Sequence, residues 1–187
     1  MNIFEQLFSR SKIAPLKRKS DIEFERKYQS EMITSKGFEL MSTIQKEGAN
    51  LILYRHFYDE TPKEEETTIF LGVRVITKKG ILYPDPVLKA FFNDDFTSIS
   101  LADIEIEEYL SNHGYGSILL SSLIEIAKQR NINSITGWIS SVDSGHIDRL
   151  VHFYKKHNFD VILDKNSNGS LKIGDLKWKK YINKGRL

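Results

Sequence analysis

The chain has 187 residues, of which 40% are hydrophobic and 28% charged, and its net charge is +2. These values exclude a disordered or collagen-like chain, and the charge is too small to argue for a nucleic-acid partner. Cysteine is absent, which excludes a disulfide framework, a zinc finger and a thiol nucleophile. No apolar run approaches the roughly 20 residues that span a bilayer, and Met1–Leu16 lacks the apolar region of a secretory signal. We expect a cytoplasmic protein that forms one domain with an appendage.

The appendage is an N-terminal arm at residues 1–35, followed by the main domain at 36–187. Apolar side chains recur at helical spacing near the start, basic residues follow up to Lys19, and Asp21–Ile33 has the pattern of a second helix. Two interpretations stay open. The arm either packs on the domain with its charged side in water, or uses its basic run to contact a membrane or an acidic surface. We expect no stable membrane association.

The next hundred residues have the pattern of strands. Alternating or β-branched residues predict strands at Phe38–Gln45, Leu51–Tyr58, Thr67–Thr77 and Ser98–Leu110. The second of these carries bulky side chains on both faces, as does a strand that is covered on each side. The acidic run Glu64–Glu66 predicts a solvated turn. Leu82–Asp95 is ambiguous, because Pro84 and Pro86 disfavour a strand interior, and Val87–Phe92 is interpreted as one or two helical turns.

Helices and strands alternate in the C-terminal half. Apolar residues at i, i+3, i+4 and i+7 predict a helix that ends at Asn131–Asn133; they are Leu120, Leu123, Ile124 and Ala127. A strand at Ser134–Ser140 precedes a helix that Asp143 or Ser144 caps and that carries Tyr154. Strands follow at Phe159–Leu163 and Leu171–Tyr181. Trp138 and Trp178 are expected to pack, and the sheet is expected to be mixed.

The segment Ser111–Ser117 is the most informative, because it joins a strand to a helix and contains Gly114 and Gly116. The start of a helix exposes backbone N–H groups that have no partner within the helix, and its dipole favours anions. Glycines allow a phosphate to approach the backbone closely. The pattern lacks the third glycine of the dinucleotide fingerprint and the Gly-Lys-Ser/Thr of a P-loop. It therefore predicts phosphate binding of another kind, or a simple tight turn.

Together with the residues that follow, this loop resembles the GNAT superfamily of acetyl-CoA-dependent N-acetyltransferases. The family's loop has the pattern Gln/Arg-x-x-Gly-x-Gly/Ala, which Gly114 and Gly116 match and Ser111 does not. A later family helix ends in Tyr-x-x-x-Gly-Phe; here Tyr154 and Phe159 match, and Asn158 replaces the glycine. Asparagine tolerates the left-handed conformation at a helix end, so this replacement is compatible with the pattern.

The resemblance implies a mixed α+β fold, with a mostly antiparallel twisted sheet splayed around a CoA site and helices on both faces. It implies acetyl-CoA as cosubstrate, without a metal. The strand end near Ile104 and Ile106 would bind the pantetheine arm, and Tyr154 would protonate the departing thiolate. The diphosphate would be bound by the loop backbone, whose residues are Asn112, His113, Gly114, Tyr115, Gly116 and Ser117.

Acetyl transfer also requires a neutral amine, so a base or desolvation must remove a proton. Candidate bases are Glu105 and Glu107, with Asp103 behind them, and His113 is a further candidate. Without cysteine, we expect direct transfer in a ternary complex to a primary amine of a small molecule or peptide. The alternative is a GNAT-fold module that binds CoA or a protein without catalysis. The acceptor and the oligomeric state, including a homodimer, stay open.

Overall fold

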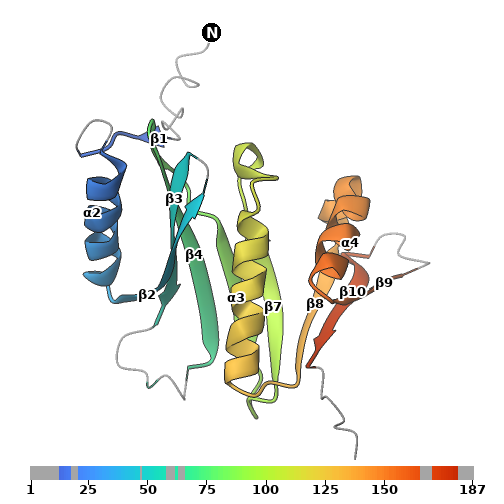
Figure 1. Ribbon diagram of the computed structural model, residues 1–187. Coiled ribbons are helices and arrows are strands. Elements are labelled where there is room, and N and C mark those ends of the chain that lie inside the picture. The colour runs from blue at the N-terminus through green and yellow to red at the C-terminus, as the bar shows by residue number, and fades with distance from the viewer. Residues whose placement is uncertain are drawn as a thin grey trace, which may run out of the picture.

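The computed structural model describes residues 13–17, 21–46, 48–57, 62, 66–164 and 170–180. Within these ranges, one ten-strand sheet runs through the molecule, and helices lie on both of its faces (Figure 1). Among the described strands, β7 and β8 pair in parallel and all other pairs are antiparallel. The predicted mixed, mostly antiparallel sheet with helices on both faces is therefore confirmed.

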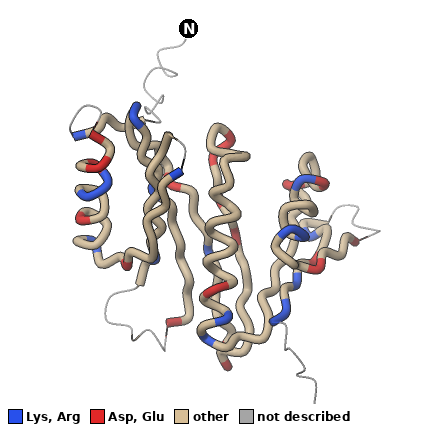
Figure 2. The backbone as a smooth tube through the Cα atoms, in the orientation of Figure 1, with Lys and Arg blue, Asp and Glu red and all other residues tan. Residues whose placement is uncertain are grey.

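The N-terminal half comprises strand β1 (Ile13–Ala14), helix α2 (Ile22–Thr34) and strands β2 (Phe38–Lys46), β3 (Ala49–His56), β4 (Thr68–Thr77) and β5 (Gly80–Leu82). Helix α2 begins after Asp21, whose Oδ1 accepts a hydrogen bond from the backbone N–H of Phe24 at 2.9 Å. Acidic and basic residues are interspersed along the helix (Figure 2). The predicted basic arm, Met1–Lys19, lies largely outside the described residues.

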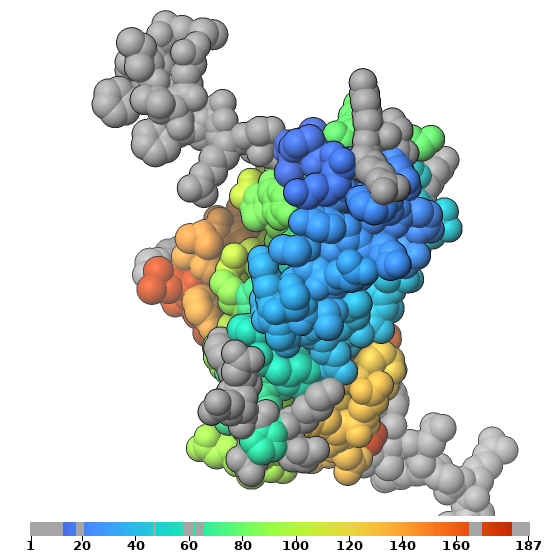
Figure 3. Space-filling view, turned by 90° about the vertical axis from the view of Figure 1, so that its left-hand side faces the viewer, coloured from blue at the N-terminus to red at the C-terminus, as the bar shows by residue number. Residues whose placement is uncertain are grey.

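Helix α2 covers one face of the sheet. Its Ile33 is 2% exposed and joins a core cluster with Ile52, Tyr54 and Ile76 from β3 and β4. Seen from that side, the residues of α2 and β2, in blue, occupy the middle of the surface (Figure 3). Strand β3 is buried on both faces, as predicted, because the other face packs toward α3.

Two predictions about the middle of the chain are wrong. Val87–Phe92 forms strand β6 rather than helical turns, because Pro84 and Pro86 lie before the strand and every second side chain, at Leu88, Ala90 and Phe92, is buried in the core. The strand predicted at Ser98–Leu110 ends earlier: β7 covers Ser98–Glu105, and a 3₁₀ turn follows at Glu108–Leu110.

The C-terminal half contains helix α3 (Tyr115–Gln129), strand β8 (Ser134–Ser140), a 3₁₀ segment (Ser141–His146), helix α4 (Ile147–Lys156) and strands β9 (Asp160–Leu163) and β10 (Lys172–Lys179). The predicted apolar stripe of α3 is buried. The predicted cap of α4 is wrong, because the 3₁₀ segment places Asp143 before the helix, and His146 occupies the cap position without a side-chain hydrogen bond. Asn158 has φ 62°, which confirms its left-handed role at the end of α4.

Two further expectations concern single side chains. Trp178 is buried, but Trp138 is 53% exposed, because its side of β8 faces away from the core. Glu66 does not lie in a solvated turn: its side chain is 2% exposed and pairs with Arg55 of β3. In the part of the chain that the structure describes, no helix is both long enough and apolar enough to cross a bilayer.

Candidate functional site

The site begins where β7 and β8 separate. The two strands pair over only three positions, Ser98 with Ser134 through Ser100 with Thr136. Beyond Ser100, β7 continues to Glu105 and β8 to Ser140, and no pairing between them is formed. The strands diverge toward the end at which α3 begins (Figure 1). The predicted splayed sheet is therefore present.

A β-bulge in β7 lies beside this divergence. Lys89 of β6 is opposite Asp103, whereas Ala90 is opposite Leu101, so Ala102 is the extra residue. The bulge changes the alternation of side chains: Leu101 is buried, Asp103 is on the opposite face, and Ile104 again packs on the core below α3. The carboxylate of Asp103 is thereby placed at the end of the strand and on the face away from α3.

The loop before α3 exposes backbone donors to the divergence. Asn112 and Gly114 both have left-handed backbone conformations, with φ of 64° and 81°. Gly114 is the N-cap of α3 and provides no side-chain acceptor, and the first backbone bond of the helix runs from Ile118 N–H to Gly114 O at 3.2 Å. The N–H groups in the first turn of α3 have no acceptor within the helix. This arrangement fits an anionic group at Gly114.

The six predicted loop residues differ in their surroundings. Asn112, His113 and Gly114 are exposed, Ser117 is half-buried, and Tyr115 and Gly116 are buried. A Cβ on Gly116 would lie 3.2 Å from Ile106 Cδ1 and 3.4 Å from Phe153 Cζ, so this glycine permits close packing between the loop, the end of β7 and α4. The side chains of Tyr115, Ile104 and Ile106 pack on the core; Tyr115 is buried, whereas Ile104 and Ile106 are half-buried and also line a groove.

Lys46 at the end of β2 also reaches this loop. Its ammonium donates a hydrogen bond to the backbone oxygen of His113, 67 positions further along the chain. No pattern in the sequence indicated this contact, because it depends on the pairing of β2 and β3 within the sheet.

Tyr154 lies on the C-terminal half of α4, near both diverging strands, since the charges of Asp103 in β7 and of Asp143 just after β8 act on its phenol. Its ring packs between Phe153 and Phe159, with centroid distances of 5.1 and 5.5 Å, and the residue is 8% exposed. Its hydroxyl has no hydrogen-bond partner in the described part of the chain. The fully buried side-chain atoms without a partner there are Arg55 Nε and Glu66 Oε1, so Tyr154 Oη itself reaches accessible space. Burial, followed by the charges of Asp143 and Asp103, raises the pKa of this phenol.

The three predicted acidic candidates have different partners. Glu105 forms an exposed ion pair with Lys89, at 2.5 Å between Oε1 and Nζ. Glu107 is exposed and lies beyond β7, at the start of the 3₁₀ turn. Asp103 forms no ion pair with any residue that the structure describes, and partial desolvation, then the nearby charges of Glu105 and Asp143, raises its pKa. The electrostatic environment of Asp103 therefore favours proton uptake.

A groove of about 810 Å³ opens beside Asp103 on the face of the sheet that carries α2. Phe70 and Tyr83 contribute aromatic surface, and Lys89 is the one basic residue among the described residues that line the groove. Its carboxylates come from Asp85, Asp103, Glu105, Glu107 and Glu108. We call it the acidic groove. At neutral pH, its net negative charge favours a cationic ligand.

A buried polar network supports one wall of the acidic groove. Asp85 accepts hydrogen bonds from Arg74 Nε and from the Tyr54 hydroxyl, each at 2.8 Å. Arg74 also donates to Gln29 of α2, and Gln29 Nε2 donates to Glu25 at 2.8 Å. Burial raises the pKa of Asp85, and the hydrogen bonds from Arg74 and Tyr54 oppose that shift. The network connects α2 to the strands and holds Asp85 in place.

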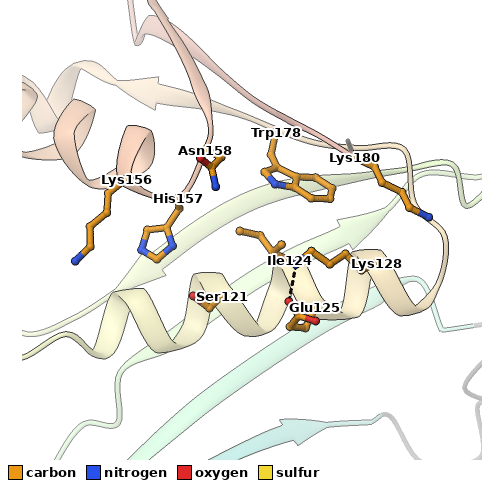
Figure 4. A pocket seen from close by; sticks show the side chains of 9 residues that line it. All are labelled: Ser121, Ile124, Glu125, Lys128, Lys156, His157, Asn158, Trp178 and Lys180. Atoms are coloured by element: carbon orange, nitrogen blue, oxygen red, sulfur yellow. Dashed lines mark hydrogen bonds and ion pairs between the residues drawn. The ribbon is translucent and has the colours of Figure 1, made fainter. Parts of the chain in front are cut away.

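A second groove, of about 580 Å³, lies between α3, the end of α4 and β10 (Figure 4). Ile124 and Trp178 lie within it, and Lys128, Lys156 and Lys180 line it. None of the residues predicted for the site lines this groove. Lys128 already pairs with Glu125, and Lys180 donates to the side-chain oxygen of Asn131, so two of the three ammonium groups are engaged.

No metal centre is recognised within the described ranges, where no group of three or more His, Cys, Asp or Glu side chains could hold an ion.

Comparisons with known proteins give the following. No protein-family model matches the chain. Over 90 residues, it is 43% identical to the uncharacterized protein YocC of Bacillus subtilis (strain 168), across 48% of this chain and 52% of that protein. The chain thus spans about half the length of the curated relative that it matches.

Similar solved structures include the PaiA N-acetyltransferase from Thermoplasma acidophilum in complex with coenzyme A, with TM-score 0.46 and 14% identity over 63% of this chain and 64% of that one. Another is the IAA acetyltransferase from Bacillus cereus ATCC 14579, with TM-score 0.48 and 14% identity over 70% and 99% of the two chains. Because these scores are below 0.5 and both identities are 14%, neither structure assigns a role to a residue of this chain.

Proposed function

We propose that the protein is a GNAT-type N-acetyltransferase that transfers an acetyl group from acetyl-CoA to a primary amine. The observation that carries the proposal is the hydroxyl of Tyr154, which belongs to a buried residue, has no partner among the described residues, and lies where β7 and β8 diverge. The resemblance of the loop and of the end of α4 to the family's motifs supports it.

The first turn of α3 would bind the diphosphate of CoA. Its backbone N–H groups lack partners within the helix, and no acidic residue lies in that turn to repel an anion. Gly114 is exposed and has no Cβ to obstruct the phosphates. Beyond Ser100, β7 remains paired with β6 but no longer with β8, and the backbone groups on its β8 side are available to the pantetheine arm, as the resemblance implies for Ile104 and Ile106.

The acidic groove would bind the amine. A protonated amine is attracted by the carboxylates there. Among them, Asp103 is the one whose charge acts on the phenol of Tyr154. Acetyl-CoA supplies an activated thioester. Asp103 would accept the proton that the amine loses, and Tyr154 would donate a proton to the departing sulfur. Glu105 is assigned no proton transfer, because its carboxylate is already paired with Lys89.

The test measures free CoA with a thiol reagent while the protein is incubated with acetyl-CoA and a panel of amines. We expect CoA release with at least one amine. Calorimetry should show micromolar binding of acetyl-CoA that Gly114→Glu abolishes, because the new carboxylate would occupy the diphosphate position. Gly37→Glu is the matched control, since Gly37 also has a positive φ, 83°, but lies in the turn after α2.

The same assay separates catalysis from the non-catalytic alternative. Binding of acetyl-CoA without turnover for any amine would favour a CoA-binding module. Absence of binding would contradict the proposed site as a whole.

A further inference from the structure

Lys46 contacts the loop before α3 in two ways. Its Nζ donates a hydrogen bond to the backbone oxygen of His113, and the same atom lies 3.2 Å from the point that a Cβ on Gly114 would occupy. For Gly114, this ammonium is the one atom found within 4 Å of that point in the described part of the chain. The positive charge therefore lies next to the exposed N-cap of α3.

The β2–β3 hairpin fixes this position. Lys46 pairs with Ala49 at the end of the hairpin, and Gly48, with φ 74°, makes the tight turn between the strands. Two positions before Lys46, Ile44 packs against the core that includes α3. Side chains two apart in a strand share a face, so Lys46 projects toward the start of that helix.

We propose that Lys46 is the cation that binds the diphosphate of CoA at this loop. The inference rests on the proposed function, and it names a binding residue outside the loop motif. Ser111 is short and neutral and stands where the family pattern has Gln or Arg, so the motif itself lacks that long amide or basic side chain. An ammonium has three donors. One can remain on His113 while the others reach phosphate oxygens, so binding requires no rupture of the existing contact.

The expected effect is moderate, because Lys46 is exposed. A charge-assisted contact at a solvated site contributes less than a buried one, and we expect Lys46→Met to weaken CoA binding about three- to tenfold. The dependence of affinity on salt should become shallower, since screening acts on the charge that has been removed. Folding stability should change little, because the methylene stem is retained.

The experiment measures CoA affinity by calorimetry at low and high salt, and kcat/KM for acetyl-CoA and for S-acetylpantetheine, which lacks the diphosphate. Lys46→Met should lower the affinity for CoA and the kcat/KM for acetyl-CoA, and should leave the kcat/KM for S-acetylpantetheine unchanged. Lys46→Arg should retain most of the CoA affinity. Lys79→Met, at an exposed position in the β4–β5 turn, is the control and should have no effect.

Two results would overturn the inference alone. The first is a Lys46→Met variant with the CoA affinity and salt dependence of the wild-type protein. The second is an equal loss of kcat/KM for acetyl-CoA and for S-acetylpantetheine, which would indicate a structural role of Lys46. If the wild-type protein itself fails to bind CoA, the proposed function fails, and the inference fails with it.

Discussion

Replacing Tyr154 by Phe separates the chemistry of the phenol from the packing of its ring. The ring is held between Phe153 and Phe159, and phenylalanine retains these contacts. The hydroxyl has no hydrogen-bond partner among the described residues, so its removal breaks no bond in the folded protein. We therefore expect the free energy of unfolding to change by less than about 0.5 kcal/mol.

The effect on turnover should be much larger. A positioned general acid contributes roughly 10²- to 10⁴-fold to a rate, and we expect the lower limit here, because a thiolate is a good leaving group. A hundredfold loss of kcat corresponds to about 2.7 kcal/mol in the activation free energy. The KM for acetyl-CoA should change little, since the diphosphate contacts are distant from the phenol along the cosubstrate.

The assay is CoA release under saturating substrates, combined with urea unfolding of the same preparations. Tyr28→Phe on α2 is the control, because it makes the same chemical change away from the divergence of β7 and β8. Wild-type turnover in Tyr154→Phe would refute the acid role. A large loss of stability would show that the hydroxyl has a structural partner.

Three further predictions follow from individual contacts. Asp103→Asn should lower kcat about a hundredfold and remove the acid limb of the pH–rate profile. In the wild-type protein, this limb should lie above the ordinary aspartate range, because the pKa of Asp103 is raised. An unchanged profile in the variant would exclude Asp103 as the base. Gly72→Ala should destabilise the fold by about 3 kcal/mol in urea unfolding. The new Cβ would lie 2.2 Å from Tyr54 Cζ and would displace the ring from its hydrogen bond to Asp85. The control Gly145→Ala should have almost no effect, because no atom lies within 4 Å of the position of its Cβ. Burial, followed by the charge of Lys156, lowers the pKa of His157 below its ordinary 6.5. The unfolded chain therefore binds the proton at higher pH than the folded one, and the folding stability should fall as the pH drops below about 6.5. His157→Gln should flatten this pH dependence in thermal melts, and an equally steep curve would contradict the prediction.

The sequence predicted correctly those helices, strands and helix ends that depend on residues close together in the chain. The apolar stripe of α3, the bounds of β8 and the left-handed conformation of Asn158 all depend on residues close in sequence, and all are confirmed. The family resemblance also led to Tyr154, although nothing in the sequence shows that its hydroxyl lacks a partner.

The predictions that were wrong depend on tertiary contacts. Pro84 and Pro86 disfavour a strand interior, but both lie in the segment that precedes β6. The strand forms because β4 and β7 pair with it on either side. Glu66 is buried because Arg55, on a strand that precedes it in the chain, pairs with it. The position of Asp103 depends on the bulge at Ala102, which only the register with β6 reveals. Lys46 was missed for the same reason, since its contact joins segments 67 positions apart.

A crystal structure with bound CoA would test the central claim most directly. We expect the diphosphate within hydrogen-bond distance of the backbone N–H groups in the first turn of α3, and the sulfur beside Tyr154 Oη, between the diverging ends of β7 and β8. CoA bound elsewhere, for example in the groove at Trp178, or a sulfur distant from Tyr154, would contradict the account.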